Sequence, residues 1–445
     1  MKAQKTYKYI ILGFVALLLT ACSNSDAEQK FDQSPTDRLN ARQKELNDLL
    51  LSSENGWKAV YFTDNTVLGG YTHLFKFAAD ETVQMASDFD EDTSVYKSEY
   101  AIQLGSTVSL VFTTKNRIHL LSESDNYPID ALESKGYLGD FQFLYYGQEN
   151  GEIIFRTNRN NQELRFVKAT AQDWIDLPKN IDMIANVIGA DTRPLFRSLE
   201  TNDGKTIHQF DFSFSEITRY AQANSIEAGY AISYDMGIGY TPTGIVVSPA
   251  VEVGGQKLTN FVYNDTDGSF TATGTNGVRA SIKYSTTPTV ITNDYKILLA
   301  GNPQKVYGYL DAYLYSAPTN SNLFNELVNE INANLPAGQY IDRVQLVFNN
   351  AQNGTYIQYL FVGKGQIVHF VTTKEDAVNK TIILTNDGWN QTAVNIAFLK
   401  NLDNQLTNPK GLYFKKENFT HNASNTIYTF TSASSNFRMT TYTLN

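Results

Sequence analysis

One short segment of the sequence concentrates carboxylates at a spacing that could bind a metal ion. Asp88, Asp90 and Asp92 occupy positions 1, 3 and 5 of a twelve-residue loop that ends at Glu99. Oxygen ligands at these positions are typical of calcium-binding loops. Position 6 is Thr93, where the sharp turn of such a loop requires glycine, and the flanking residues predict strands instead of helices. The segment predicts either a calcium site or, as the simpler alternative, a solvated acidic hairpin loop.

The remaining residues do not form a recognisable catalytic group. The five histidines are His73, His119, His208, His369 and His421. They are far apart and show no His-Glu-x-x-His spacing, so a helical zinc site is not expected. Three segments match only part of a known motif. Met236 to Gly239 lacks the third glycine of a dinucleotide-binding loop, and Gly363-Lys364 lacks the earlier glycine of a phosphate-binding loop. Ser94 to Lys97 has the spacing of a serine–lysine nucleophile pair but lacks the companion Lys-Thr-Gly. A non-catalytic protein is therefore predicted. A hydrolase that assembles its carboxylates from distant positions stays open as an alternative.

The only cysteine, Cys22, follows a segment that is typical of a secretory signal. Three lysines precede a short apolar run from Ile10 to Leu19. Leu19-Thr20-Ala21-Cys22 then resembles a bacterial lipobox, which implies cleavage before Cys22 and acylation of its sulfur. Residues 1–22 are predicted to be a lipoprotein signal peptide, and acylated Cys22 to anchor the protein in the outer membrane. An ordinary signal followed by a free cysteine is the alternative.

Charge and composition restrict the partners and the location of the protein. The formal charge is −10, and residues 1–22 contain three lysines and no acidic residue, so the chain after the signal carries −13. This acidity argues against nucleic acid as a partner. The polar segment 23–33 is predicted to be a flexible tether. Its Ser25 to Glu28 resembles the export signal of some Bacteroidetes lipoproteins, which favours the cell surface over the periplasmic face of the outer membrane.

The first part of the mature chain predicts a helix followed by a meander of short strands. Ser34-Pro35 is typical of a helix start, since serine caps and proline occupies the first turn. Short apolar segments separated by polar turns then predict eight strands: 58–63, 73–79, 82–87, 96–104, 108–114, 141–146, 152–157 and 163–168. Residues 34–169 are therefore predicted to form an antiparallel barrel or sandwich, similar to lipocalins by analogy.

The second part predicts more sheet. Residues 170–189 are a helical connector that begins with Thr170 as a cap and is interrupted by Pro178. Residues 190–445 are predicted to be a β-rich, α+β region with a helix at 323–335, and a division near residue 318 is considered. Exposed aromatic residues could provide flat surfaces for a sugar, and Trp57, Tyr71 and Trp389 are the candidates. Burial in the core is the alternative for each of them.

Several short segments carry a resemblance to a known family. They are Gly56-Trp57 to Tyr61, Gly69-Gly70-Tyr71, Phe77, Val83 to Asp88, Tyr100, Leu110 to Phe112, Ile118-His119, Gly139 to Phe143, Gly254-Gly255 with Leu258 to Phe261, and Tyr428 to Phe430. These segments resemble a Bacteroidetes lipoprotein family known as domain of unknown function 4302. Such lipoproteins often accompany outer-membrane nutrient-uptake complexes, so the resemblance implies an accessory role in glycan or peptide capture. An adhesion or structural role is the remaining alternative.

Overall fold

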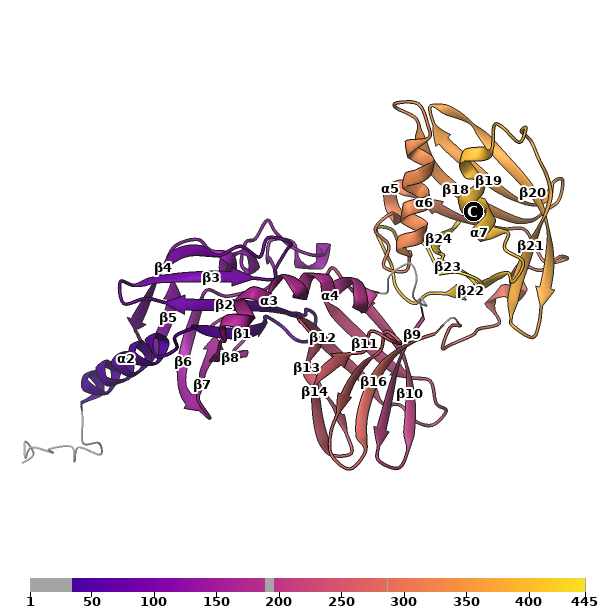
Figure 1. Cartoon of the computed structure of the whole chain (residues 1–445). Coiled ribbons are helices and arrows are strands. Elements are labelled where there is room, and N and C mark those ends of the chain that lie inside the picture. The colour runs from indigo at the N-terminus through magenta and orange to yellow at the C-terminus, as the bar shows by residue number, and fades with distance from the viewer. Residues whose placement is uncertain (1–33, 189–195, 286, 445) are drawn as a thin grey trace, which may run out of the picture.

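The protein consists of three closed antiparallel barrels of eight strands each, which follow one another along the chain (Figure 1). The computed structural model describes residues 34–188, 196–285 and 287–444. The predicted mainly β fold with a few helices is confirmed, and the N-terminal sheet is a closed barrel. No helix within these described ranges is long and apolar enough to cross a membrane.

The first barrel is a simple meander. Its strands are β1 (Trp57–Phe62), β2 (Gly70–Phe77), β3 (Thr82–Ser87), β4 (Tyr96–Leu104), β5 (Val108–Phe112), β6 (Gln142–Glu149), β7 (Glu152–Thr157) and β8 (Glu163–Lys168). Short helical turns η1 (Arg117–Leu121) and η2 (Asp130–Leu132) separate β5 from β6. The barrel closes where β1 pairs antiparallel with β8, Trp57 opposite Lys168. Alternate residues point inward, and aromatic rings fill the centre, with Phe75 and Phe166 stacked 4.8 Å apart.

Helix α2 (Pro35–Leu51) precedes this barrel and packs against it. The predicted cap is present, since the Ser34 hydroxyl accepts a hydrogen bond from the Asp37 amide at 3.1 Å. Leu46 and Leu50 are buried in the core of the first barrel. The Trp57 indole donates to the Leu50 carbonyl at 2.9 Å, which satisfies an otherwise unpaired carbonyl at the end of the helix.

Two short helices, α3 (Ala171–Asp176) and α4 (Pro178–Ile188), connect the first barrel to the second. Thr170 and Asp173 form the predicted capping box. Pro178 begins the second helix, so the predicted interruption at this residue is confirmed.

The second barrel is also a meander, closed by pairing of its last strand with its first. Its strands are β9 (Phe196–Asp203), β10 (Ile207–Ser215), β11 (Tyr220–Ser225), β12 (Ser233–Thr241), β13 (Gly244–Val253), β14 (Gln256–Tyr263), β15 (Phe270–Thr273) and β16 (Val278–Ser285).

Glycines allow the first two barrels to approach closely. A Cβ atom on Gly237 in β12 would lie 2.4 Å from the Leu68 carbonyl oxygen, and one on Gly69 would lie 2.3 Å from the Arg219 Cβ. The Gly69 amide donates to the Thr218 carbonyl at 2.8 Å across this junction. The glycines of the Met236 to Gly239 segment thus serve barrel packing, since any side chain at Gly237 would separate the two backbones.

The third barrel includes most of the remaining helices, whose buried apolar residues join its core. Its strands are β17 (Lys305–Leu310), β18 (Tyr340–Asn350), β19 (Gly354–Val362), β20 (Lys364–Asp376), β21 (Thr381–Trp389), β22 (Leu412–Lys416), β23 (Ile427–Ser432) and β24 (Arg438–Leu444). Its helical elements are α5 (Asp311–Leu314), α6 (Asn322–Ala333), η4 (Ala397–Leu399) and α7 (Lys400–Leu406). The connection from β16 to β17 contains η3 (Asp294–Leu298) and separates the second barrel from the third. Residue 318, near which the sequence analysis considered a division, lies further along the chain, between α5 and α6.

The second and third barrels touch through this connection and through aromatic residues. The Thr289 hydroxyl donates to the Arg197 carbonyl of the second barrel at 3.4 Å, and the Thr292 hydroxyl donates to the Phe414 carbonyl of the third at 3.2 Å. Phe196 and Tyr413 meet edge to face across the two barrels at 6.3 Å. These contacts place the start of β9 beside β22.

Candidate functional site

The acidic loop does not bring its four predicted ligands together. Asp88 is fully buried, Asp90 forms an ion pair with Arg117, and Asp92 accepts a hydrogen bond from the Tyr96 hydroxyl at 2.6 Å. Glu99 lies on β4 with an exposed side chain. Hydrogen bonds from Tyr96 and Ser94 lower the pKa of Asp92 to about 2. Among the described residues, no group of three or more His, Cys, Asp or Glu side chains is placed to hold a metal ion.

Asp88 instead joins the first two barrels. Its carboxylate accepts from the Thr72 amide at 2.8 Å, the Asn180 side-chain amide at 2.8 Å and the Arg219 guanidinium at 3.2 Å. The Arg219 guanidinium also lies 4.2 Å from the ring centre of Tyr71. The donors already surrounding Asp88 explain why it is not available to a cation.

The predicted aromatic surfaces lie in or against the barrel cores. Trp57 is fully buried, and Tyr71 is 2 % exposed. Trp389 is half-buried and stacks on His369, with ring centres 4.0 Å apart. His369 is buried and hydrogen bonds to Asp403 at 2.8 Å, as expected for a core histidine. Trp57 and Tyr71 therefore have no exposed face for a ligand, because the barrel interior uses their full area for packing.

A concave site with convergent polar groups lies between the second and third barrels. Two adjoining cavities of about 280 and 430 Å³ share Arg197, Phe214, Ser215, Pro318 and Arg438. We call this pair of cavities the inter-barrel cleft. The first cavity is lined by the end of α4, the turn after β10, residues 315–325 and the start of β24. The second lies over β10, β11 and β22. Volumes of this size are typical of small-ligand sites.

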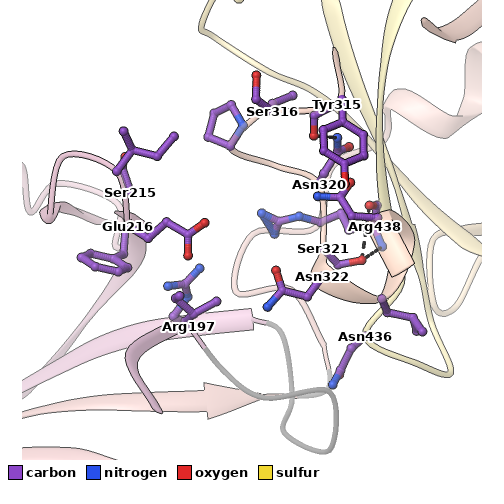
Figure 2. Close-up of a pocket in the computed structure, with 17 residues that line it drawn as sticks. Arg197, Ser215, Glu216, Tyr315, Ser316, Asn320, Ser321, Asn322, Asn436 and Arg438 are labelled. Carbon is purple, nitrogen blue, oxygen red and sulfur yellow. Dashed lines mark hydrogen bonds between the residues drawn. The ribbon is translucent and has the colours of Figure 1, made fainter. Parts of the chain in front are cut away.

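Arg438 extends from the third barrel into the cleft (Figure 2). Ser321, which caps α6, fixes its backbone, since the Arg438 amide donates to the Ser321 hydroxyl at 2.9 Å and the Ser321 amide donates back to the Arg438 carbonyl at 3.0 Å. The Arg438 Nε donates to the Thr319 carbonyl at 2.9 Å. The position of this guanidinium is thus fixed by the helix start and the strand start together. Burial lowers the pKa of Arg438 to about 10.

Arg197 and Glu216 face the same space from the second barrel (Figure 2). The Arg197 Nη1 donates to the Val187 carbonyl at 3.2 Å, at the C-terminal end of α4, where the helix dipole favours a cation. Burial lowers the pKa of Arg197. Burial raises the pKa of Glu216, although the charge of Arg197 opposes this, and it also raises the pKa of Asp211 in the second cavity.

The sequence analysis did not identify these cleft residues. Arg197 and Arg438 lie in different barrels and have no motif around them. The only local signal is the Ser321 cap of a helix, which predicts a helix start and not a binding site. Their proximity depends on how two barrels pack, which residue spacing does not show.

Comparison with known proteins places the chain in a family of unknown function. The chain belongs to the family described as Domain of unknown function (DUF4302), whose profile matches residues 27–265. This match covers the first barrel and the second barrel through β14, so Arg197 and Glu216 lie inside it and Arg438 outside. No curated protein matches the chain.

Among solved structures, the DNA polymerase sliding clamp from Bacillus subtilis is similar at 10% identity over 92% of this chain and 97% of that chain, with a TM-score of 0.15. A score this low supports no inference about fold or function.

Proposed function

We propose that this protein is a lipid-anchored envelope protein that binds a ligand in the inter-barrel cleft, as a non-catalytic component of outer-membrane nutrient capture in Bacteroidetes. The observation that carries the proposal is the cleft itself, with two guanidiniums and several amides and hydroxyls around about 280 and 430 Å³ of space. Concave sites with a few fixed polar groups are the usual form of ligand sites.

The cleft can be tested by filling it. Ser316 is exposed and lines the first cavity, so Ser316→Trp places an indole where a ligand would lie. We expect isothermal titration of the full chain in detergent, against a panel of neutral and acidic glycans and peptides, to yield a ligand whose affinity falls at least ~10-fold in this variant. Ser106→Trp, on an exposed hairpin of the first barrel, is the matched control and should bind normally. Equal affinity in the wild type and Ser316→Trp would place binding elsewhere.

The anchor rests on Cys22 and the residues before it, which lie outside the described residues. We expect Cys22→Ser to abolish incorporation of labelled fatty acid and to move the protein from the membrane fraction to the soluble fraction, because the acyl chains supply most of the membrane affinity. Ser23→Ala should remain in the membrane fraction. Retention of Cys22→Ser in washed membranes would contradict the anchor. Protease added to intact cells distinguishes the proposed cell-surface location from the periplasmic face.

A surface hydrolase is the second candidate, because two carboxyl groups with raised pKa, Asp211 and Glu216, line the cleft. A raised pKa is what a general acid requires. Shortening of a bound oligosaccharide during prolonged incubation, lost in Glu216→Gln, would favour this candidate. Unchanged oligosaccharide would favour the binding protein.

A further inference from the structure

The first cavity contains more cationic than anionic charge. Its lining includes Arg197 and Arg438 but only one carboxylate, Glu216, in a chain whose formal charge is −10. Lys415 and Glu417 in the second cavity already pair with each other at 3.5 Å.

The hydrogen bonds of the two guanidiniums go to neutral carbonyl groups. Arg197 donates to the Val187 carbonyl and Arg438 to the Thr319 carbonyl. No ion pair recorded between described residues includes either arginine. Burial is the largest influence and disfavours the charged form of both, although Glu216 and Asp211 favour that of Arg197, and Glu417 and Asp211 favour that of Arg438. The charge of Arg197 also acts against that of Arg438. Since buried charges are stable only when paired, this cavity favours an anion.

Hydroxyl groups of a ligand also have partners here. Asn325 lines the first cavity, and its Oδ1 atom is buried and has no hydrogen-bond partner among the described protein atoms. A buried acceptor without a donor is costly, so a ligand hydroxyl that donates to it would be favoured. Asn322 and Ser316 add exposed polar side chains to the same wall.

An exposed aromatic ring completes the first cavity. Tyr315 is 40 % exposed, and its hydroxyl is held by Asn329, whose side-chain amide donates to it at 3.1 Å. This leaves the ring available to cover the apolar face of a pyranose. The sequence analysis did not name Tyr315 among its candidate aromatic residues, which were Trp57, Tyr71 and Trp389.

We propose that the inter-barrel cleft binds an acidic sugar, a pyranose unit that carries a carboxylate, within an oligosaccharide. The carboxylate interacts with Arg197 and Arg438, for which guanidinium geometry is well suited. A ring hydroxyl donates to Asn325, and the apolar face of the ring packs on Tyr315. This inference rests on the proposed ligand-binding function and names its substrate class.

The test compares charged and uncharged forms of one oligosaccharide. Trigalacturonate and its fully methyl-esterified form keep the same hydroxyls and differ in charge, while inorganic phosphate supplies an anion without a sugar. We expect the full chain in detergent to bind trigalacturonate with an affinity about 10- to 100-fold higher than the methyl ester, the factor associated with hydrogen bonds to charged groups. Phosphate should bind more weakly than trigalacturonate.

Variants then locate the contact. Arg438→Gln and Arg197→Gln should each reduce the affinity for trigalacturonate by about 10- to 100-fold, while Arg197→Lys, which keeps the charge, should lose less. Arg279→Gln is the matched control, because Arg279 is exposed on the second barrel and outside the cleft lining. Asn325→Leu removes the acceptor and should weaken the methyl ester as well. Thermal unfolding of each variant without ligand identifies any that fail to fold. If a glutamine variant does not fold, the affinity of Arg197→Lys for trigalacturonate tests the contact in its place.

The outcomes separate this inference from the proposed function. Equal affinity for trigalacturonate and its methyl ester, or binding that is unaffected in both glutamine variants, would overturn the acidic-sugar inference. If a neutral glycan binds to the wild type and binds more weakly to Ser316→Trp, the proposed function stands without this substrate class. If phosphate binds as tightly as trigalacturonate, the site recognises an anion only, and the sugar part of the inference is wrong.

Discussion

Replacing Asp88 with alanine is expected to lower the free energy of unfolding by about 3–5 kcal/mol, because it leaves the Arg219 guanidinium buried without its anion. Asp88 is fully buried, and Arg219 is 5 % exposed. Desolvation lowers the pKa of Arg219, but the charge of and hydrogen bond to Asp88, together with Tyr71 and Tyr240, outweigh it, so that the net shift is upward. Urea unfolding followed by tryptophan fluorescence measures the loss, since Trp57 and Trp174 both lie on the first-barrel side of the junction.

An exposed ion pair gives the control for this prediction. Lys44 and Asp48 pair on the surface of α2 with side chains 76 % and 58 % exposed, so Lys44→Ala should change the free energy of unfolding by less than about 0.5 kcal/mol. The double variant Asp88→Leu with Arg219→Met should recover part of the loss, because it removes both charges together. A loss below about 1 kcal/mol in Asp88→Ala would show that the barrels do not depend on this pair.

The replacement of His73 by phenylalanine is expected to make the protein less sensitive to acid. His73 is fully buried on β2, and its Nε2 atom has no partner among the described protein atoms. Burial lowers the pKa of His73 from its usual value of 6.5 to about 3. As the pH falls below 6.5 the unfolded chain takes up a proton that the folded chain does not, so folding becomes less favourable until the pH approaches 3.

The size of the effect follows from these two pKa values. Between pH 7 and pH 4 the wild type should lose about 3 kcal/mol of unfolding free energy that His73→Phe does not lose. The measurement is urea unfolding of both proteins at the two pH values. Phe75→Leu changes the neighbouring ring, which stacks on His73 at 5.9 Å, without changing a titrating group. The difference in unfolding free energy between Phe75→Leu and the wild type should be the same at pH 7 and pH 4. A pH-independent difference for His73→Phe would contradict the prediction.

The two junctions between barrels differ in how their buried charges are paired. The Asp88–Arg219 pair at the first junction satisfies its charges internally, with amides that donate to the carboxylate and with carbonyls and aromatic rings around the guanidinium. At the second junction, Arg197 and Arg438 keep part of their charge directed into open space. A pair closed on itself stabilises the assembly, whereas charge directed into a cavity can act on a ligand.

The sequence determined the features that depend on neighbouring residues. Strands β3, β4, β7 and β8 match the predicted ranges, because alternation of apolar and polar side chains has a period that is visible locally. The caps at Ser34 and Thr170 and the interruption at Pro178 were equally predictable, since each acts within one helical turn. Strand β11 is harder to recognise from the sequence. Its Tyr220-Ala-Gln-Ala-Asn-Ser segment presents only small residues to the core and shows little hydrophobic contrast.

The tertiary structure alone decided the closure of three barrels and the identity of the cleft. Closure requires β1 to pair with β8 and β9 with β16, and these contacts join residues far apart in the chain. The same separation explains why Asp88 pairs with Arg219 and not with a cation, and why Arg197 and Arg438 share a cavity. Local periodicity sets which face of a strand is buried, but long-range packing decides which buried faces meet and which polar groups remain open to a ligand.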